Sequence, residues 1–87
     1  MYIILVYDIG VERVAKALKL CRQYLHWIQN SVFEGEISEL KLRELLDKLK
    51  SILKEEEDSV IVFILRQEKW VEKRIIGLSK GSTDMIL

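Results

Sequence analysis

An acidic residue, Asp8, ends the first apolar stretch of the sequence, which covers residues 2–7. A short uninterrupted apolar run predicts a strand that is covered on both faces. Side chains alternate across a strand, so Asp8 shares a face with Ile4 and Val6. Burying an unpaired carboxylate is costly, which makes Asp8 a candidate functional site. The alternative is that Asp8 forms a local turn or caps the helix that follows.

Three other chemical groups have structural interpretations. Cys21 lies on the apolar side of a predicted helix and is interpreted as a small buried residue, because a nucleophile needs a nearby base. The single histidine, His26, follows the end of that helix and is interpreted as structural or exposed. The acidic run at residues 55–58 opposes a helix dipole and is interpreted as a solvated turn.

Composition predicts one domain spanning residues 1–87, with 49% hydrophobic residues. The 14 basic and 14 acidic residues cancel, so any nucleic-acid contact must be a local patch. A single cysteine excludes an internal disulfide and a cysteine-rich zinc site, and it fits a reducing compartment. With no membrane-length apolar run and no signal peptide in the sequence, we expect a cytoplasmic protein without membrane contact.

Hydrophobic periodicity places the elements that must position Asp8. A strand at residues 2–8 is followed by a helix at 11–25, a short strand near 27–29 and a longer one near 31–37. Ser38 is a predicted N-cap for a helix that runs from Glu39 to about Lys54. Later segments predict a strand at 59–65, another near 70–76, and an apolar end at 85–87.

This order predicts an α+β fold, the ferredoxin-like βαββαβ arrangement with an antiparallel sheet and two helices on one face. Two helices cover only one face, yet the strands at 3–7 and 60–65 are apolar on both. The economical cover for the second face is another copy of the same sheet, so we expect a homodimer.

Four segments occur in order along the chain: Tyr7-Asp8-Ile9, then Arg13, then residues 29–35 (Gln-Asn-Ser-Val-Phe-Glu-Gly), then residues 57–60 (Glu-Asp-Ser-Val). In this order and at this spacing the chain resembles the small CRISPR-associated endonuclease family. That family is the lesser partner in the spacer-acquisition complex. The resemblance covers nearly the whole chain.

The resemblance implies a ferredoxin-like homodimer whose C-terminal strand pairs with the other protomer's sheet. It also implies that Asp8 is catalytic and binds Mg²⁺, or another divalent cation, at the dimer interface. Tyr7, Arg13 and Phe33 match positions associated with the family's site, and Ser31 lies beside them in the motif. Many relatives have a basic residue where this chain has Trp27, which weakens the expected nucleic-acid contact there.

The function expected from these features is metal-dependent hydrolysis of RNA or DNA during spacer acquisition. Two copies of Asp8 facing each other across a two-fold axis would make a usable cation site. One alternative is a non-catalytic, DNA-binding scaffold that bridges the larger integrase subunits. Another is a regulatory subunit that binds a small ligand at its dimer interface. The basic residues available for a DNA duplex or single-stranded RNA are Arg13, Lys16, Lys19, Arg22, Lys69, Lys73, Arg74 and Lys80.

Overall fold

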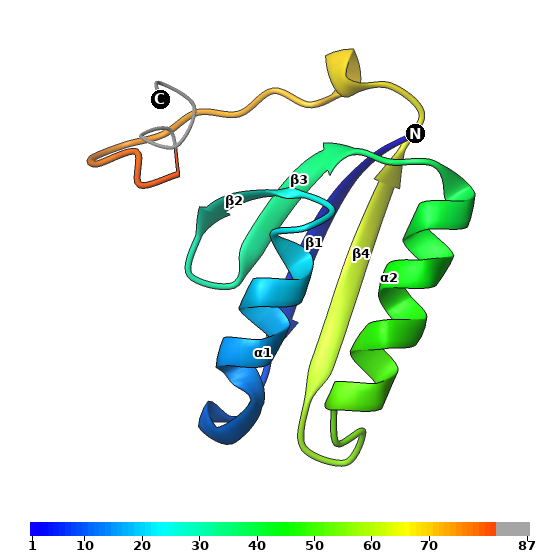
Figure 1. Ribbon diagram of the computed structural model, residues 1–87. Coiled ribbons are helices and arrows are strands. Elements are labelled where there is room, and N and C mark those ends of the chain that lie inside the picture. The colour runs from blue at the N-terminus through cyan, green and yellow to red at the C-terminus, as the bar shows by residue number, and fades with distance from the viewer. Residues whose placement is uncertain (82–87) are drawn as a thin grey trace.

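Two helices pack on one face of a four-stranded antiparallel sheet (Figure 1). The computed structural model describes residues 1–81. Its strand order, β2-β3-β1-β4, is the ferredoxin-like arrangement that the sequence predicts. The elements in chain order are β1 (Tyr2–Asp8), α1 (Val11–Cys21), β2 (His26–Gln29), β3 (Val32–Glu36), α2 (Glu39–Ile52), β4 (Ser59–Leu65) and the short 3-10 helix η1 (Glu68–Trp70).

The start of α2 is confirmed, whereas α1 ends earlier than the sequence predicts. Ser38 caps α2, and its hydroxyl accepts a hydrogen bond from the Lys41 amide at 3.1 Å. The last residue of α1 is Cys21, not Leu25, because the backbone tightens into i→i+3 hydrogen bonds there, such as Tyr24 N to Cys21 O at 3.1 Å. This tight turn brings the chain back to the sheet as β2.

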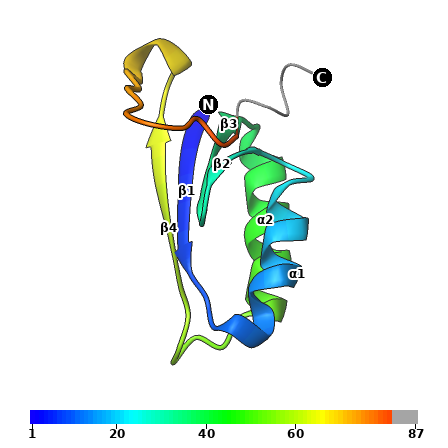
Figure 2. The ribbon, with the colours of Figure 1, turned by 90° about the vertical axis from the view of Figure 1, so that its left-hand side faces the viewer.

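The core lies between the helices and one face of the sheet. On β1, alternate side chains point into it, and Ile3, Leu5 and Tyr7 are almost fully buried. Buried residues from β3 and both helices complete this core: Ala17, Cys21, Leu25, Phe33, Ile37, Leu42, Leu45 and Leu49. Figure 2 shows both helices on the same side of the sheet. Because Ile3, Leu5 and Tyr7 point toward the helices, the side chains between them on β1 must point toward the opposite face of the sheet.

The other face of the sheet, here called the open face, is not covered by α1 or α2 (Figure 2), and residues 71–76 line a groove with Ile4 and Val32 on part of it. Strand register places Ile4 opposite Phe63, and Val6 between Val32 and Ile61. Ile61 and Phe63 are 53% and 54% exposed, which is unusual for large apolar side chains on a sheet. The predicted two-sided apolar character of β1 and β4 is thus confirmed.

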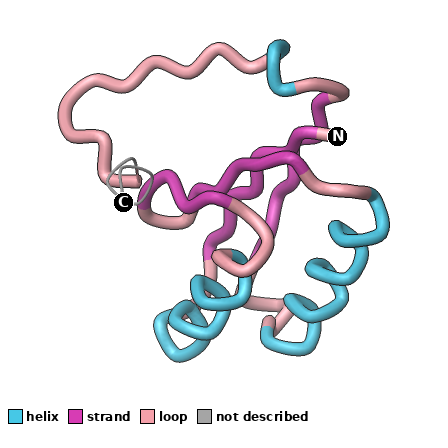
Figure 3. The backbone as a smooth tube through the Cα atoms, turned by 45° about the horizontal axis from the view of Figure 1, so that its top comes forward, coloured by secondary structure: helices cyan, strands magenta, loops and turns pink. Residues whose placement is uncertain are grey.

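The strand predicted near residues 70–76 does not form within the described single chain. After β4 the chain forms η1, and residues 71–81 follow as irregular structure that curves over the sheet, away from the helices (Figure 3). A strand needs a neighbouring backbone to satisfy its hydrogen bonds, and this segment lies across the sheet rather than along an edge. The predicted apolar end at residues 85–87 lies outside the described part of the chain.

Candidate metal and phosphodiester site

Asp8 is exposed at the last position of β1, directly opposite Ser59 of β4. Because side chains alternate, its carboxylate lies on the open face with Ile4 and Val6. The N-cap residue of α1 is Gly10, so the interpretation of Asp8 as a helix cap is wrong. Within residues 1–81 the Asp8 carboxylate accepts no hydrogen bond and forms no ion pair. It is therefore available to a ligand.

A second carboxylate, Asp58, lies just before Ser59 but is completely buried as a side chain. Its Oδ1 accepts from Gly10 N at 2.8 Å and from Arg13 Nη2 at 2.9 Å. Its Oδ2 accepts from Arg13 Nε at 2.6 Å and from Lys54 N at 3.0 Å. Four donors satisfy both oxygens, so Asp58 has no lone pair left for a metal ion.

The Arg13 guanidinium holds the pKa of the Asp58 carboxyl far below its usual range, and the Lys54 and Gly10 amides act in the same direction. The same hydrogen bond raises the pKa of Arg13. Because Asp58 is buried, the prediction that it belongs to a solvated turn is wrong. The preceding residues 55–57 are exposed, as predicted. Its membership in the 57–60 motif was the signal that could have set it apart.

The remaining predicted site residues separate into two groups. Tyr7 and Phe33 pack against each other on the helix side, with ring centroids 5.7 Å apart, and burial raises the pKa of Tyr7. Ser31 lies in the turn before β3, and its carbonyl accepts from the Tyr7 amide at 3.1 Å. These three residues therefore adjoin the Asp8 strand, but the two aromatic side chains face away from Asp8. Arg13 is bound to Asp58, with a side chain only 12% exposed.

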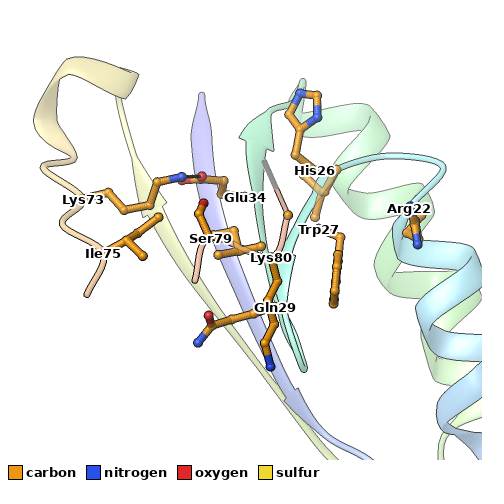
Figure 4. A pocket seen from close by; sticks show the side chains of 12 residues that line it. Arg22, His26, Trp27, Gln29, Glu34, Lys73, Ile75, Ser79 and Lys80 are labelled. Atoms are coloured by element: carbon orange, nitrogen blue, oxygen red, sulfur yellow. Dashed lines mark hydrogen bonds and ion pairs between the residues drawn. The ribbon is translucent and has the colours of Figure 1, made fainter. Parts of the chain in front are cut away.

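A cavity of about 190 Å³ lies away from Asp8, between β2 and the C-terminal segment (Figure 4). Lys73 crosses one side of it and forms an ion pair with Glu34 of β3. Arg22 lies over the Trp27 ring at 5.7 Å from the ring centre. The cavity thus combines cationic and aromatic side chains, although Lys73 and Arg22 already have protein partners.

No group of three or more potential metal ligands occurs in the described chain. Asp8 alone does not make a cation site, and a complete divalent-cation site needs further oxygen ligands from elsewhere. Among the same residues, no helix is long and apolar enough to cross a membrane.

The protein is an α+β protein of the ferredoxin-like class. One face of its sheet is covered by helices, and an exposed carboxylate stands at the end of the central strand β1. The family model described as "CRISPR associated protein Cas2" matches residues 1–73. The chain belongs to the Cas2 family.

Two curated relatives are similar over the full length of the chain, and both are named "CRISPR-associated endoribonuclease Cas2". The protein from Dictyoglomus turgidum is 48% identical, with all of both chains covered. The protein from Methanothermobacter thermautotrophicus is 44% identical, with all of this chain and 96% of the relative covered. These relatives extend the family match beyond residue 73 to the end of the chain.

Solved structures agree with the fold. A crystal structure described as cas2 has a TM-score of 0.86 at 47% identity and covers 93% of this chain and 91% of its own. The crystal structure of Streptococcus pyogenes Cas2 at pH 6.5 has a TM-score of 0.72 at 28% identity and covers 85% and 99% of the two chains. The ferredoxin-like fold predicted from the sequence is confirmed.

Proposed function

We propose that the protein is a metal-dependent endoribonuclease that acts as a homodimer in CRISPR spacer acquisition in the cytoplasm. The observation that carries this proposal is the exposed Asp8 carboxylate, which has no hydrogen-bond or ion-pair partner within residues 1–81, on the same face as the half-exposed apolar side chains of Ile61 and Phe63. The names of the full-length relatives support RNA as the substrate class. DNA remains a second substrate to test, because phosphodiester hydrolysis requires the same chemistry in both.

The residues at this end of the sheet fit Mg²⁺ or another hard divalent cation, but one chain is insufficient. Asp8 supplies a hard oxygen ligand, and Asp58 is excluded because four hydrogen bonds occupy its oxygens. Asp8 residues from two copies would complete the pair. A cation held there would lower the pKa of a bound water and screen the phosphate charge.

Dimerisation through the open face covers its exposed apolar side chains and brings the second Asp8 carboxylate to the cation site. Ile61 and Phe63 are about half exposed in one chain, and a second sheet would remove them from water. Without a cation, two facing Asp8 carboxylates would repel each other, which couples cation binding to assembly. Light scattering at micromolar concentration should give twice the 10.3 kDa chain mass.

A non-catalytic scaffold is the second candidate function. Its support is the run of exposed apolar side chains after β4, where Trp70, Ile76 and Leu78 are 66%, 101% and 77% exposed. In this alternative the segment docks on the larger integrase subunit, and exposed lysines of α1 such as Lys16 contact a DNA duplex.

A cleavage assay separates these two functions. Wild-type protein and Asp8→Ala are incubated with single-stranded RNA and duplex DNA, each with Mg²⁺ and with a chelator. The enzyme proposal predicts cleavage by wild type that needs Mg²⁺ and disappears in Asp8→Ala, while both proteins keep the same mass. Equal cleavage by both proteins, or none by wild type on either substrate, would refute catalysis by Asp8.

A further inference from the structure

The buried ion pair between Arg13 and Asp58 lies immediately behind the strand end that presents Asp8. Asp58 adjoins Ser59, which is the register partner of Asp8. Its Oδ1 also accepts from the amide of Gly10, two residues after Asp8. One side chain therefore fixes both the strand opposite Asp8 and the backbone that leaves Asp8.

We propose that Asp58 and Arg13 form a positioning clamp that sets the direction of the Asp8 carboxylate for its cation. Asp58 and Arg13 do not touch the cation in this proposal and act through the backbone of residues 8–10. The inference rests on the proposed role of Asp8 as a metal ligand, and it assigns to Asp58 a function beyond folding.

The geometry favours a clamp because Asp58 binds the Gly10 backbone amide as well as the Arg13 guanidinium. Arg13 and Asp58 are 45 residues apart, and the contact is bidentate, with distances of 2.6 and 2.9 Å. A bidentate contact fixes orientation as well as distance. The Lys54 amide also donates to Oδ2 of Asp58 at 3.0 Å, so donors from two chain segments, residues 10–13 and Lys54, hold the carboxylate.

Gly10 is the position where the clamp leaves no space for a side chain. A Cβ atom there would lie 2.5 Å from Arg13 Nη2, closer than real contacts allow. The loop after Asp8 is thus fitted around the guanidinium itself. Arg13 is linked to this loop through Asp58, which accepts from the Gly10 amide, and Asp8 is two residues before Gly10.

The test compares Mn²⁺ affinity and local backbone protection in five proteins: wild type, Asp8→Asn, Asp58→Asn, Arg13→Lys and the control Glu57→Gln. Mn²⁺ affinity is measured by electron paramagnetic resonance well below each melting temperature, so loss of stability alone leaves it unchanged. Hydrogen–deuterium exchange reports on the peptide that contains residues 8–10. Arg13→Lys keeps the positive charge but cannot make the bidentate contact with Asp58. It provides the test of the clamp if Asp58→Asn does not fold.

We expect Asp58→Asn to bind Mn²⁺ roughly tenfold more weakly, the usual scale for losing a group that orients a ligand. Arg13→Lys should weaken binding in the same direction, and exchange at residues 8–10 should accelerate in both. The matched control is Glu57→Gln. Glu57 is exposed and lies 3.6 Å from Arg13 Nη2, so this variant removes the same charge from the neighbouring position without breaking the clamp.

Two results would overturn the clamp itself. One is Asp58→Asn or Arg13→Lys with wild-type Mn²⁺ affinity while Asp8→Asn has lost binding. The other is Glu57→Gln with the same loss as Asp58→Asn, because the effect would then be general electrostatics. Failure of the metal site looks different: wild type and Asp8→Asn would behave alike, and both the proposed function and the clamp would fall.

Discussion

Asp8 and Asp58 stand at the same end of the sheet but point to opposite sides of it. Asp8 is exposed on the open face, whereas the Asp58 side chain is fully buried and accepts four hydrogen bonds. Asp58 is one residue before Ser59, the register partner of Asp8, and this offset of one residue reverses the direction of a side chain. One carboxylate is thus free to bind, and the other is committed to the protein.

The buried carboxylate predicts acid sensitivity. An unfolded aspartate has a pKa of about 3.9, and the Asp58 pKa in the folded protein is far lower. A lowered folded-state pKa contributes stability that is complete above the unfolded value and is lost as pH falls through the folded one. We expect the urea unfolding free energy to fall below about pH 4 in wild type and to fall less in Asp58→Asn. Equal pH dependence in both proteins, at equal concentration, would contradict this assignment.

The core between the helices and the sheet predicts that two leucines of α2 contribute very differently to the free energy of unfolding. Leu45 is fully buried and Leu40 is 71% exposed. Leu45→Ala should cost about 2–5 kcal/mol of unfolding free energy because it leaves a cavity. Leu40→Ala should change it by no more than about 0.5 kcal/mol. Urea denaturation of both variants measures the difference, and similar losses would show that α2 packs through another face.

Burial of the single cysteine predicts chemical inertness. Cys21 is inaccessible in the core, and desolvation raises the pKa of its thiol to about 12. A thiol reagent at pH 8 should therefore react with native protein far more slowly than with protein in denaturant. Fast, complete labelling of the native protein would show that α1 does not cover Cys21.

The C-terminal segment predicts a change in assembly when it is removed. Ile75 and Ile76 line a groove with Ile4 and Val32 of the open face. In the homodimer we expect the segment to pair with the partner's sheet edge. A chain that ends after Arg74 should dissociate at higher concentrations in sedimentation experiments. Unchanged dissociation would assign the segment another role.

The sequence was sufficient to predict the four sheet strands and the start of α2, since short runs of apolar and β-branched residues and the Ser38 cap are local signals. It also predicted the position of Asp8 at the mouth of β1 on the face shared with Ile4. Both results depend only on residues that are close together in the chain.

The features that escaped prediction depend on distant partners. The Arg13–Asp58 contact spans 45 residues, and hydrophobic periodicity does not distinguish Asp58 from the exposed acidic residues before it. Residues 71–76 include strand-forming residues but lie as irregular structure in the single chain, because β propensity needs a neighbouring backbone. Tyr7 and Phe33 matched site positions in sequence, yet their register places the side chains in the core.

Counting Mn²⁺ ions bound per chain tests the central claim most directly, because each chain offers one Asp8 and a shared site needs two. The wild-type dimer is titrated with Mn²⁺ at a protein concentration far above the dissociation constant, beside Asp8→Asn as the matched variant. We predict saturation at one ion for every two chains in wild type and no binding at this site in Asp8→Asn. One ion per chain, or equal uptake by the two proteins, would contradict a cation site built from two copies of Asp8.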